Sequence, residues 1–416
     1  MSTLPRLGVV LDFGAASPLG ILASARGLCE VVFLYDGELP YPRAHAEELA
    51  ALATVCDLAG CTTREAAGRV GQLGLAALVT FSETQLTRTA ALARACGIGH
   101  SLSPDAAQAV TDKLLQRQLL AAAGVEVTRS RLVQESGDVE PALEHVGLPA
   151  VLKPRSGAAS AFTCQVDSAG QAHQRLSEFQ DRSPGPERAA FVLEELLVGE
   201  AAAAGKEWGD YVSIESVVQS GQVRHVEVTG KFPLAPPFRE TGYVVPSTLA
   251  EQLADQVRAL TTAAVLALGI HDGVTHTEIK LTPTGPRVIE VNGRLGGYVS
   301  ELIRRARGFD LVRAALATAL GQRVEIAEPR YRRHTFAYFL TPPMDRRRLS
   351  RLDGVDQLSA LPGIHTVELT KQVGDPIDWH DGTLAYLGIV HGSAADHDDV
   401  LDLVATIERT LLIDYD

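Results

Sequence analysis

The sequence has few cysteines, no long apolar run and little lysine, and these shortages exclude several classes of protein. Five cysteines among 416 residues, none in a C-x-x-C spacing, argue against a disulfide scaffold or a zinc site and favour free thiols. No stretch approaches the roughly 18 apolar residues of a membrane span. The apolar start is broken by Asp12 and Pro18 and lacks a basic segment, so we expect no signal peptide and a cytoplasmic location.

Positive charge is also in short supply. The formal net charge is −13 at pH 7, and the basic runs, at residues 304–307, 331–334 and 345–351, are short. A nucleic-acid surface needs a broad basic stripe, so we expect neither a nucleic-acid nor a membrane partner. Hydrophobic residues make up 46% of the chain, enough for packed cores, and the length predicts two or three domains.

Lysine makes up only six of the 38 basic residues. Arginine therefore supplies nearly every surface cation. A lysine that is retained suggests a place where a compact ammonium on a thin stem is needed. The lysines are at positions 113, 153, 206, 231, 280 and 371.

The order of predicted elements separates two kinds of fold. Up to about residue 104, apolar runs alternate with helical stretches of a length that predicts a parallel α/β sheet. A single long helix is expected over residues 106–123, ended by Gly124. Beyond residue 127, strands and helices are mixed as in an α+β fold. The later strands are expected at 130–133, 150–153, 190–193, 211–218, 222–229, 275–281, 287–292 and 335–340, and the last helix at 396–411.

The strongest motif is a predicted hairpin with turn residues at its centre. Folding about Thr284 would place Glu278 opposite Glu290 and His276 opposite Asn292. Two directly opposed carboxylates repel each other, so a cation is expected between them. Carboxylate and amide oxygens suit Mg²⁺, which leaves coordination sites for substrate phosphates.

Arg294 follows two residues after Asn292 and falls on the same face if the strand continues. It could stabilise negative charge on a phosphoryl group or an oxyanion. Gly296 and Gly297 come next, as in a loop that a ligand approaches closely. The alternative is an exposed hairpin with an ordinary polar face.

Three further stretches are weaker signals. An apolar strand delivers Lys153 to a loop of small residues, 155–160, whose backbone N–H groups could approach phosphates. Lys113 and Arg117 lie on the predicted long helix, where an exposed helical face is the plainer interpretation. Another strand ends in Glu194 and Glu195 and could hold an adenine on its edge or simply terminate.

Taken in order, these pieces resemble the ATP-grasp superfamily, in particular its branch of amino-acid ligases and biotin-carboxylase-like enzymes. The resemblance spans about residues 80–300, and the E-x-N-x-R-x-G-G pattern from Glu290 to Gly297 is its most diagnostic element. It implies an N-terminal α/β domain over residues 1–105 and an ATP-grasp core over 106–325. The core would include a lid subdomain at about 128–197, and a C-terminal α+β segment, 326–416, would pack on it.

The resemblance also implies roles for individual residues. Lys113 and Lys153 would contact ATP phosphates, and Arg294 would stabilise the acyl-phosphate step and contact substrate together with the two glycines. Metal ligands for Mg²⁺, with Mn²⁺ as the alternative ion, would be Glu278, Glu290 and Asn292. The remaining ATP-binding residues would be a phosphate-covering loop and the adenine strand: Ser156, Gly157, Ser160, Glu194, Glu195, Leu196 and Leu197.

A second stretch, residues 229–246, resembles the segment that borders the phosphates and substrates in the ligase branch. There Lys231 would reach the γ-phosphate as a catalytic residue, and Glu240 would meet a substrate amine. Two departures bear on substrate binding. Tyr243 stands where many relatives carry His, and Glu200, Glu207 and Asp210 compete for the ribose-binding role.

The reaction implied is ATP-dependent amide formation through an acyl phosphate, with release of ADP and phosphate. Amino acids or short peptides are the expected substrates, a carrier-protein thiol is a further possible acceptor, and a homodimer is expected. Two alternatives stay open. One is a carboxylase-like or nucleotide-biosynthetic ATP-grasp enzyme, and the other is a regulatory module that binds ATP without turnover.

Overall fold

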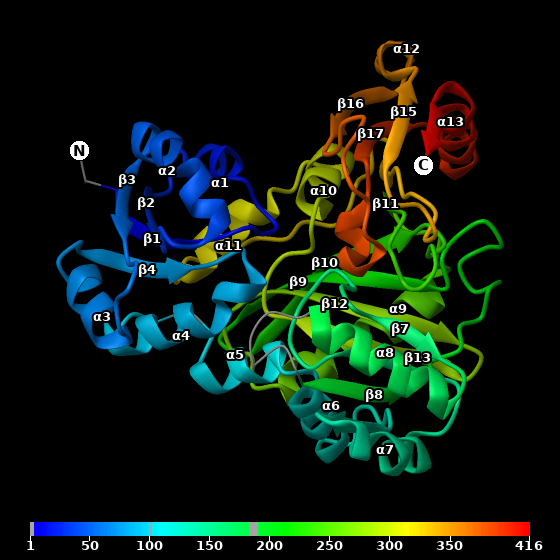
Figure 1. Cartoon of the computed structure of the whole chain (residues 1–416). Coiled ribbons are helices and arrows are strands. Elements are labelled where there is room, and N and C mark those ends of the chain that lie inside the picture. The colour runs from blue at the N-terminus through cyan, green and yellow to red at the C-terminus, as the bar shows by residue number, and fades with distance from the viewer. Residues whose placement is uncertain (1–3, 100–101, 183–189) are drawn as a thin grey trace.

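The computed structural model describes residues 4–99, 102–182 and 190–416. Three regions follow one another along the chain (Figure 1). The N-terminal residues form a separate sheet, the middle of the chain forms the central body, and the last strands gather at its far end. Within the described residues, no helix combines the length and apolar character needed to cross a bilayer.

The N-terminal region is a parallel sheet, as the sequence predicted, and its four strands have the order β3-β2-β1-β4. The short strand β3 was not predicted, because only four residues with little burial form it. The strands are β1 (Arg6–Leu11), β2 (Glu30–Tyr35), β3 (Thr54–Asp57) and β4 (Leu75–Val79). The helices are α1 (Pro18–Ala25), α2 (Pro40–Leu52), α3 (Thr63–Gly71) and α4 (Leu86–Ala95), with the 3₁₀ turn η1 (Glu83–Gln85) before α4.

The single helix expected over residues 106–123 is wrong. Helix α5 (Pro104–Thr111) ends at Asp112, and α6 (Lys113–Ala122) begins there. Asp112 has an extended backbone, and its carboxylate accepts hydrogen bonds from the amides of Leu114 and Leu115, which makes it the N-cap of α6.

A small antiparallel sheet with the order β5-β8-β6-β7 follows. Its strands are β5 (Ser130–Val133), β6 (Ala150–Pro154), β7 (Cys164–Val166) and β8 (Phe191–Glu195). The 3₁₀ turn η2 (Ser136–Asp138) and the helices α7 (Val139–Val146) and α8 (Ala169–Arg182) accompany it. Phe179, Phe191 and Leu193 are buried in a separate hydrophobic cluster of this region. We call the part of the chain from β5 to β8 the lid region.

The central sheet has eight antiparallel strands in the order β13-β12-β9-β10-β11-β14-β17-β16. Its first five are β9 (Tyr211–Gln219), β10 (Gln222–Lys231), β11 (Gly242–Val245), β12 (Gly273–Thr282) and β13 (Gly285–Asn292). The other three, β14 (His334–Phe339), β16 (Ile364–Leu369) and β17 (Gly388–Ala394), follow residue 325, so the sheet continues into the C-terminal region.

Helices and one further strand pair surround this sheet (Figure 1). The helices are α9 (Glu251–Ala267), α10 (Val299–Arg307), α11 (Leu311–Ala319), α12 (Val355–Ser359) and α13 (His397–Thr410), with the 3₁₀ segment η4 (Trp379–Ala385). The pair is β15 (Leu349–Asp353) with β18 (Leu412–Tyr415).

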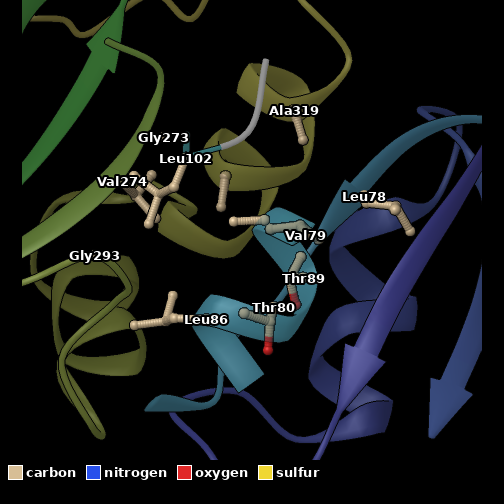
Figure 2. A pocket seen from close by; sticks show the side chains of 12 residues that line it. Leu78, Val79, Thr80, Leu86, Thr89, Leu102, Gly273, Val274, Gly293 and Ala319 are labelled. Carbon is tan, nitrogen blue, oxygen red and sulfur yellow. The ribbon is translucent and has the colours of Figure 1, made fainter. Parts of the chain in front are cut away.

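The N-terminal sheet meets the central body at a small apolar cavity (Figure 2). Leu86, Leu102 and Val274 border it, and its volume is about 40 Å³. That is far below the space a nucleotide needs. The cavity is a packing gap behind the end of β13, and the chemistry must be sought elsewhere.

Candidate active site

The hairpin of β12 and β13 forms the centre of the site. Glu278 pairs with Glu290, and His276 pairs with Asn292, which confirms the register predicted from the turn. A register shift after Glu278 pairs Ile279 with Val288 and Thr282 with Gly285. The connecting turn is therefore one residue shorter than a turn centred on Thr284 would be. The two carboxylates therefore come from directly opposed positions of neighbouring strands.

Each of these carboxylates is held by a neighbouring cation. Lys113 donates to Glu290 at 2.7 Å, and His276 Nε2 lies 3.4 Å from Glu278. Burial opposes ionisation of Glu278, but His276 and the nearby Lys231 lower its pKa to about 2. The carboxylate is therefore ionised at neutral pH.

His276 is itself oriented from β9. Its Nδ1 hydrogen-bonds to Glu215, whose side chain is fully buried. Burial disfavours the imidazolium, yet Glu215 raises the pKa of His276 to about 9. Gly296 is confined here, because a β-carbon on it would lie 2.5 Å from the imidazole Nδ1.

Arg294 lies beside the same carboxylates. Its Nε donates to Glu83 at 2.8 Å, and its NH2 lies 3.3 Å from Asn292 Oδ1. Burial disfavours the charged guanidinium, but Glu83, Glu290 and Glu278 raise the pKa of Arg294. A fixed, permanently charged group is thus set next to the hairpin.

The donor set fits a divalent cation that is shared with a substrate. Within the described residues no group of three or more His, Cys, Asp or Glu side chains forms a closed metal site. Glu278, Glu290 and Asn292 instead offer two carboxylates and one amide on one face of the hairpin. Mg²⁺ is commonly held by one or two carboxylates together with substrate phosphates, so an open set of this kind suits it.

A second cluster of charges lies between α6 and the lid region. Lys153 of β6 donates to Glu194 of β8 at 2.7 Å. Arg117 binds the same carboxylate through two hydrogen bonds, of 3.1 and 3.0 Å. Burial would raise the pKa of Glu194, but the two cations lower it to about 2.

Glu195 points to the other side of β8, because successive side chains of a strand alternate in direction. It pairs with Arg129 at 2.6 Å and Arg287 at 3.1 Å, away from Lys153. Leu196 and Leu197 follow the strand and are half-buried. The structure therefore brings Glu194, and not Glu195, together with the predicted lysine.

The loop between β6 and β7 passes over Lys113, whose Nζ donates to the carbonyl of Gly157 at 2.8 Å. Gly157 has φ +137°, and Ala159 and Ser160 have φ 58° and 55°. These are left-handed conformations that non-glycine residues rarely adopt. Ser156 is exposed and Ser160 is half-buried along the loop.

Lys231, Glu240 and Tyr243 form a third cluster. The Lys231 side chain is fully buried, and its Nζ lies 2.7 Å from Glu240 and 3.9 Å from the centre of the Tyr243 ring. The Tyr243 hydroxyl donates to the same carboxylate at 2.5 Å. Burial and Glu240 raise the pKa of Tyr243, so the phenol is neutral.

Comparison with known protein families matches the part of the chain that holds most of these side chains. The model of the ATP-grasp domain matches residues 146–301. This chain contains an ATP-grasp domain. Lys153, Glu194, Lys231, Glu278 and Glu290 all lie within the matched range.

Among the proteins that the chain resembles are two curated relatives and one solved structure. Carnosine synthase 1 of Homo sapiens is 29% identical over 245 residues, 55% of this chain and 28% of the relative. Alanine–anticapsin ligase of Bacillus subtilis (strain 168) is 29% identical over 222 residues, 51% of this chain and 47% of the relative. The crystal structure of L-amino acid ligase from Bacillus licheniformis has a TM-score of 0.79 and 22% identity, covering 100% of both chains.

The chain spans about half or less of the length of the curated relatives that it matches. The solved structure, at its level of identity, shares the fold. This likeness confirms the predicted order of folds along the chain, in which a parallel N-terminal sheet is followed by the antiparallel sheets of an ATP-grasp fold.

Reasoning from sequence missed three groups in this candidate site. Arg117 is 5% exposed, so the interpretation of its helix face as solvated is wrong. Glu215 and Glu83 were not predicted at all. Only Glu215 has a local signal, since it stands in the middle of an apolar strand and has to find a buried partner.

Of the three candidates for a ribose ligand, Asp210 already has a partner. It accepts from Lys280 at 2.6 Å. A β-carbon on Gly199 would lie 1.9 Å from its carboxylate, so that segment packs tightly against it. Glu200 and Glu207 are both exposed.

Proposed function

We propose that the protein is an ATP-dependent carboxylate–amine ligase that joins amino acids or short peptides through an acyl phosphate. The observation that carries the proposal is the convergence of Arg294, Lys231 and two opposed carboxylates in an ATP-grasp domain. Carnosine synthase 1 and alanine–anticapsin ligase, whose names describe such couplings, support it.

ATP would lie between the lid region and the central sheet. Lys113 and Lys153 would contact its phosphates, and the loop with Ser156, Gly157 and Ser160 would cover them. Backbone N–H groups of such a loop are suited to phosphate oxygens. The adenine would lie against the C-terminal end of β8, beside residues 195–197. Glu194, at the same end of the strand, holds Lys153 in place through their ion pair.

Glu278, Glu290 and Asn292 would hold Mg²⁺ or Mn²⁺, which would supply positive charge beside the phosphates. Lys113 and His276 would then turn from the carboxylates toward phosphate oxygens or solvent. Arg294 and Lys231 would balance the negative charge of the transferring phosphoryl group. Glu240 would receive the ammonium group of the second substrate, with Gly296 and Gly297 bordering the first.

The reaction has two balanced steps. A substrate carboxylate oxygen attacks the γ-phosphorus, which forms the acyl phosphate and releases ADP. The ammonium of the second substrate first loses one proton, and the free amine nitrogen then attacks the acyl carbon. The bond from that carbon to the phosphate oxygen breaks, phosphate leaves, and the nitrogen gives up a second proton; phosphate takes one of the two protons and solvent takes the other. Water must be kept from the acyl phosphate, which is the role of a loop that closes over it.

We further propose that the protein acts in the cytoplasm as a homodimer. All five cysteines lie among the described residues and are free, which suits a reducing compartment.

The test is product analysis with the purified chain, Mg-ATP and a panel of amino acids and short peptides. We expect ADP and phosphate to form in amounts equal to a conjugate whose mass is the sum of its two substrates minus one water. The R294Q variant should form neither ADP nor conjugate. Release of AMP and pyrophosphate would contradict the acyl phosphate. Turnover on bicarbonate alone would identify a carboxylase-like enzyme, and ATP binding without turnover would identify a regulatory module.

A further inference from the structure

The C-terminal segment η4 reaches across to the loop that covers Lys113. The backbone N–H of Thr383 donates to the carbonyl of Ala159 at 2.7 Å. The side-chain hydroxyl of Thr383 accepts from the backbone N–H of Glu240 at 3.1 Å. The buried Thr383 of the C-terminal region thus connects the loop at residues 155–160 with the Lys231–Glu240 cluster.

Gly382, the residue before it, touches the loop more closely still. It has φ 63° and ψ −132°, a conformation that glycine adopts at little steric cost. A β-carbon there would lie 2.1 Å from the Ala159 carbonyl oxygen and 2.5 Å from the Ala161 nitrogen. Because both atoms are backbone, the loop itself would have to move.

The loop has reason to need outside support. Ala159, Ser160 and Phe162 all have φ between 51° and 58°, and such strain persists only where surrounding structure holds it. The η4 segment provides part of that support, since the Phe162 N–H donates to the carbonyl of His380 at 3.0 Å. With the bond from Thr383, two backbone bonds fix the strained turn.

The segment is anchored firmly enough to act as a fixed support. His380 is 2% exposed and bonds through Nε2 to Glu178 of α8 at 2.9 Å. Asp378 accepts from Arg182 at 2.7 Å. Trp379 packs into the hydrophobic cluster of the lid region. The η4 segment is therefore attached to the lid region on one side, and Thr383 bonds to Glu240 on the other.

We propose that Gly382 and Thr383 are positioning residues that shape the phosphate-covering loop and tie its closure to the Glu240 end of the site. The inference rests on the proposed function, because it assumes that ATP phosphates lie under this loop. The close contact between Gly382 and the loop backbone at Ala159 and Ala161 would determine the loop conformation to which ATP binds. The Thr383 hydroxyl would keep the loop in register with the acceptor substrate, so that the acyl phosphate meets amine and not water.

The test compares G382A with G374A in the full chain. Gly374 is the matched control, because it is also C-terminal and has φ +98°, while no atom lies within 4 Å of an added β-carbon. Both variants carry the backbone strain of alanine at positive φ, but only G382A pushes on the loop. Binding of Mg-ATP is measured by titration calorimetry, and folding is checked by thermal melting.

We expect G382A to weaken Mg-ATP binding at least tenfold, and G374A to stay within twofold of the wild type. A second variant, T383V, keeps the backbone N–H and loses the hydroxyl. We expect its ATP affinity to stay within twofold while the ratio of ADP formed to conjugate formed rises at least threefold.

A folded G382A with wild-type affinity for Mg-ATP would overturn the inference about the loop. If G382A does not fold, T383V decides, and an unchanged ratio of ADP to conjugate would overturn the inference. Failure of the proposed function is distinguishable, because the wild type would then bind no Mg-ATP or form no conjugate with any substrate pair.

Discussion

Glu83 in the N-terminal region accepts a hydrogen bond of 2.8 Å from Arg294 in the ATP-grasp domain. The two residues are 211 positions apart in sequence. This bond and the one from NH1 to the carbonyl of Leu295, at 2.7 Å, hold the guanidinium so that NH2 lies 3.3 Å from Asn292 Oδ1. The N-terminal region thus contributes directly to the geometry of the proposed phosphoryl-transfer site.

The first prediction concerns this orientation. E83Q keeps the size of the side chain and loses its charge, so Arg294 should turn more freely. We expect kcat to fall about 10-fold with little change in KM for ATP, whereas R294Q should lower kcat about 100-fold or more. The exposed Glu47 offers the control E47Q, which should behave as wild type in the same steady-state assay. Equal kcat for E83Q and E47Q would contradict the role of Glu83.

The second prediction separates binding from stability in the Lys153–Glu194–Arg117 cluster. K153M leaves Glu194 with both hydrogen bonds from Arg117, so the free energy of unfolding should fall by less than about 1 kcal/mol while ATP affinity drops. R117M also removes two bonds of 2.7 Å to the carbonyls of Val288 and Ile289, and should cost about 3–5 kcal/mol. Urea unfolding and ATP titration of both variants would show this contrast, and a larger loss of stability in K153M would refute it.

The third prediction concerns the metal. E278Q and E290Q each remove a charge from the hairpin face, so the Mg²⁺ concentration for half-maximal turnover should rise about 10- to 100-fold. Chelation with EDTA should abolish turnover in the wild type, and Mn²⁺ should restore it. E48Q on the surface of α2 is the control, because it changes the same net charge far from the site. An unchanged Mg²⁺ requirement in both hairpin variants would exclude them as ligands.

The fourth prediction is a pH dependence of stability. Burial raises the pKa of Glu227 to about 7, against contributions from Tyr331, 2.7 Å away, and Arg307, 3.5 Å away. The folded state then binds a proton that the unfolded state has released between about pH 4.5 and 7. Stability is therefore highest below this window and falls as the pH rises through it, by up to about 3 kcal/mol.

E227Q should remove this penalty. We expect it to unfold at a higher temperature than the wild type at pH 8, and to match the wild type at pH 4.5. Thermal melts across pH 4.5–8 would measure the difference. A variant whose melting temperature falls below that of the wild type at pH 8 would show that the Glu227 carboxylate is stabilising there.

The sequence predicted contacts made along one strand pair and missed those made across the fold. The opposition of Glu278 and Glu290 followed from a local turn and the two-residue period of strands. The break at Asp112 was missed although its capping bonds to Leu114 and Leu115 are local, and Arg155, which also holds this carboxylate, lies 43 positions away. Likewise the buried Arg117 is paired with Glu194, 77 positions away, and nothing in the helix of Arg117 indicates that partner.

The C-terminal contacts were the hardest to foresee. Gly382 and Thr383 lie in a segment without regular periodicity, and their importance depends on the loop at Ala159, more than 200 positions earlier. Positive φ at Gly382 cannot be inferred from a glycine alone, since many glycines adopt ordinary turns.

The eight-stranded sheet has a consequence for the modularity of the chain. Strand β14 completes the hydrogen bonds of β11, and β17 and β16 extend the same sheet. A chain cut at residue 325 would keep nearly all the side chains proposed to touch ATP, yet would expose the unpaired edge of β11, a template for aggregation. Successful hybrids between this chain and its relatives should therefore exchange β11, β14, β17 and β16 as one block, and crossovers between β11 and β14 should give insoluble products.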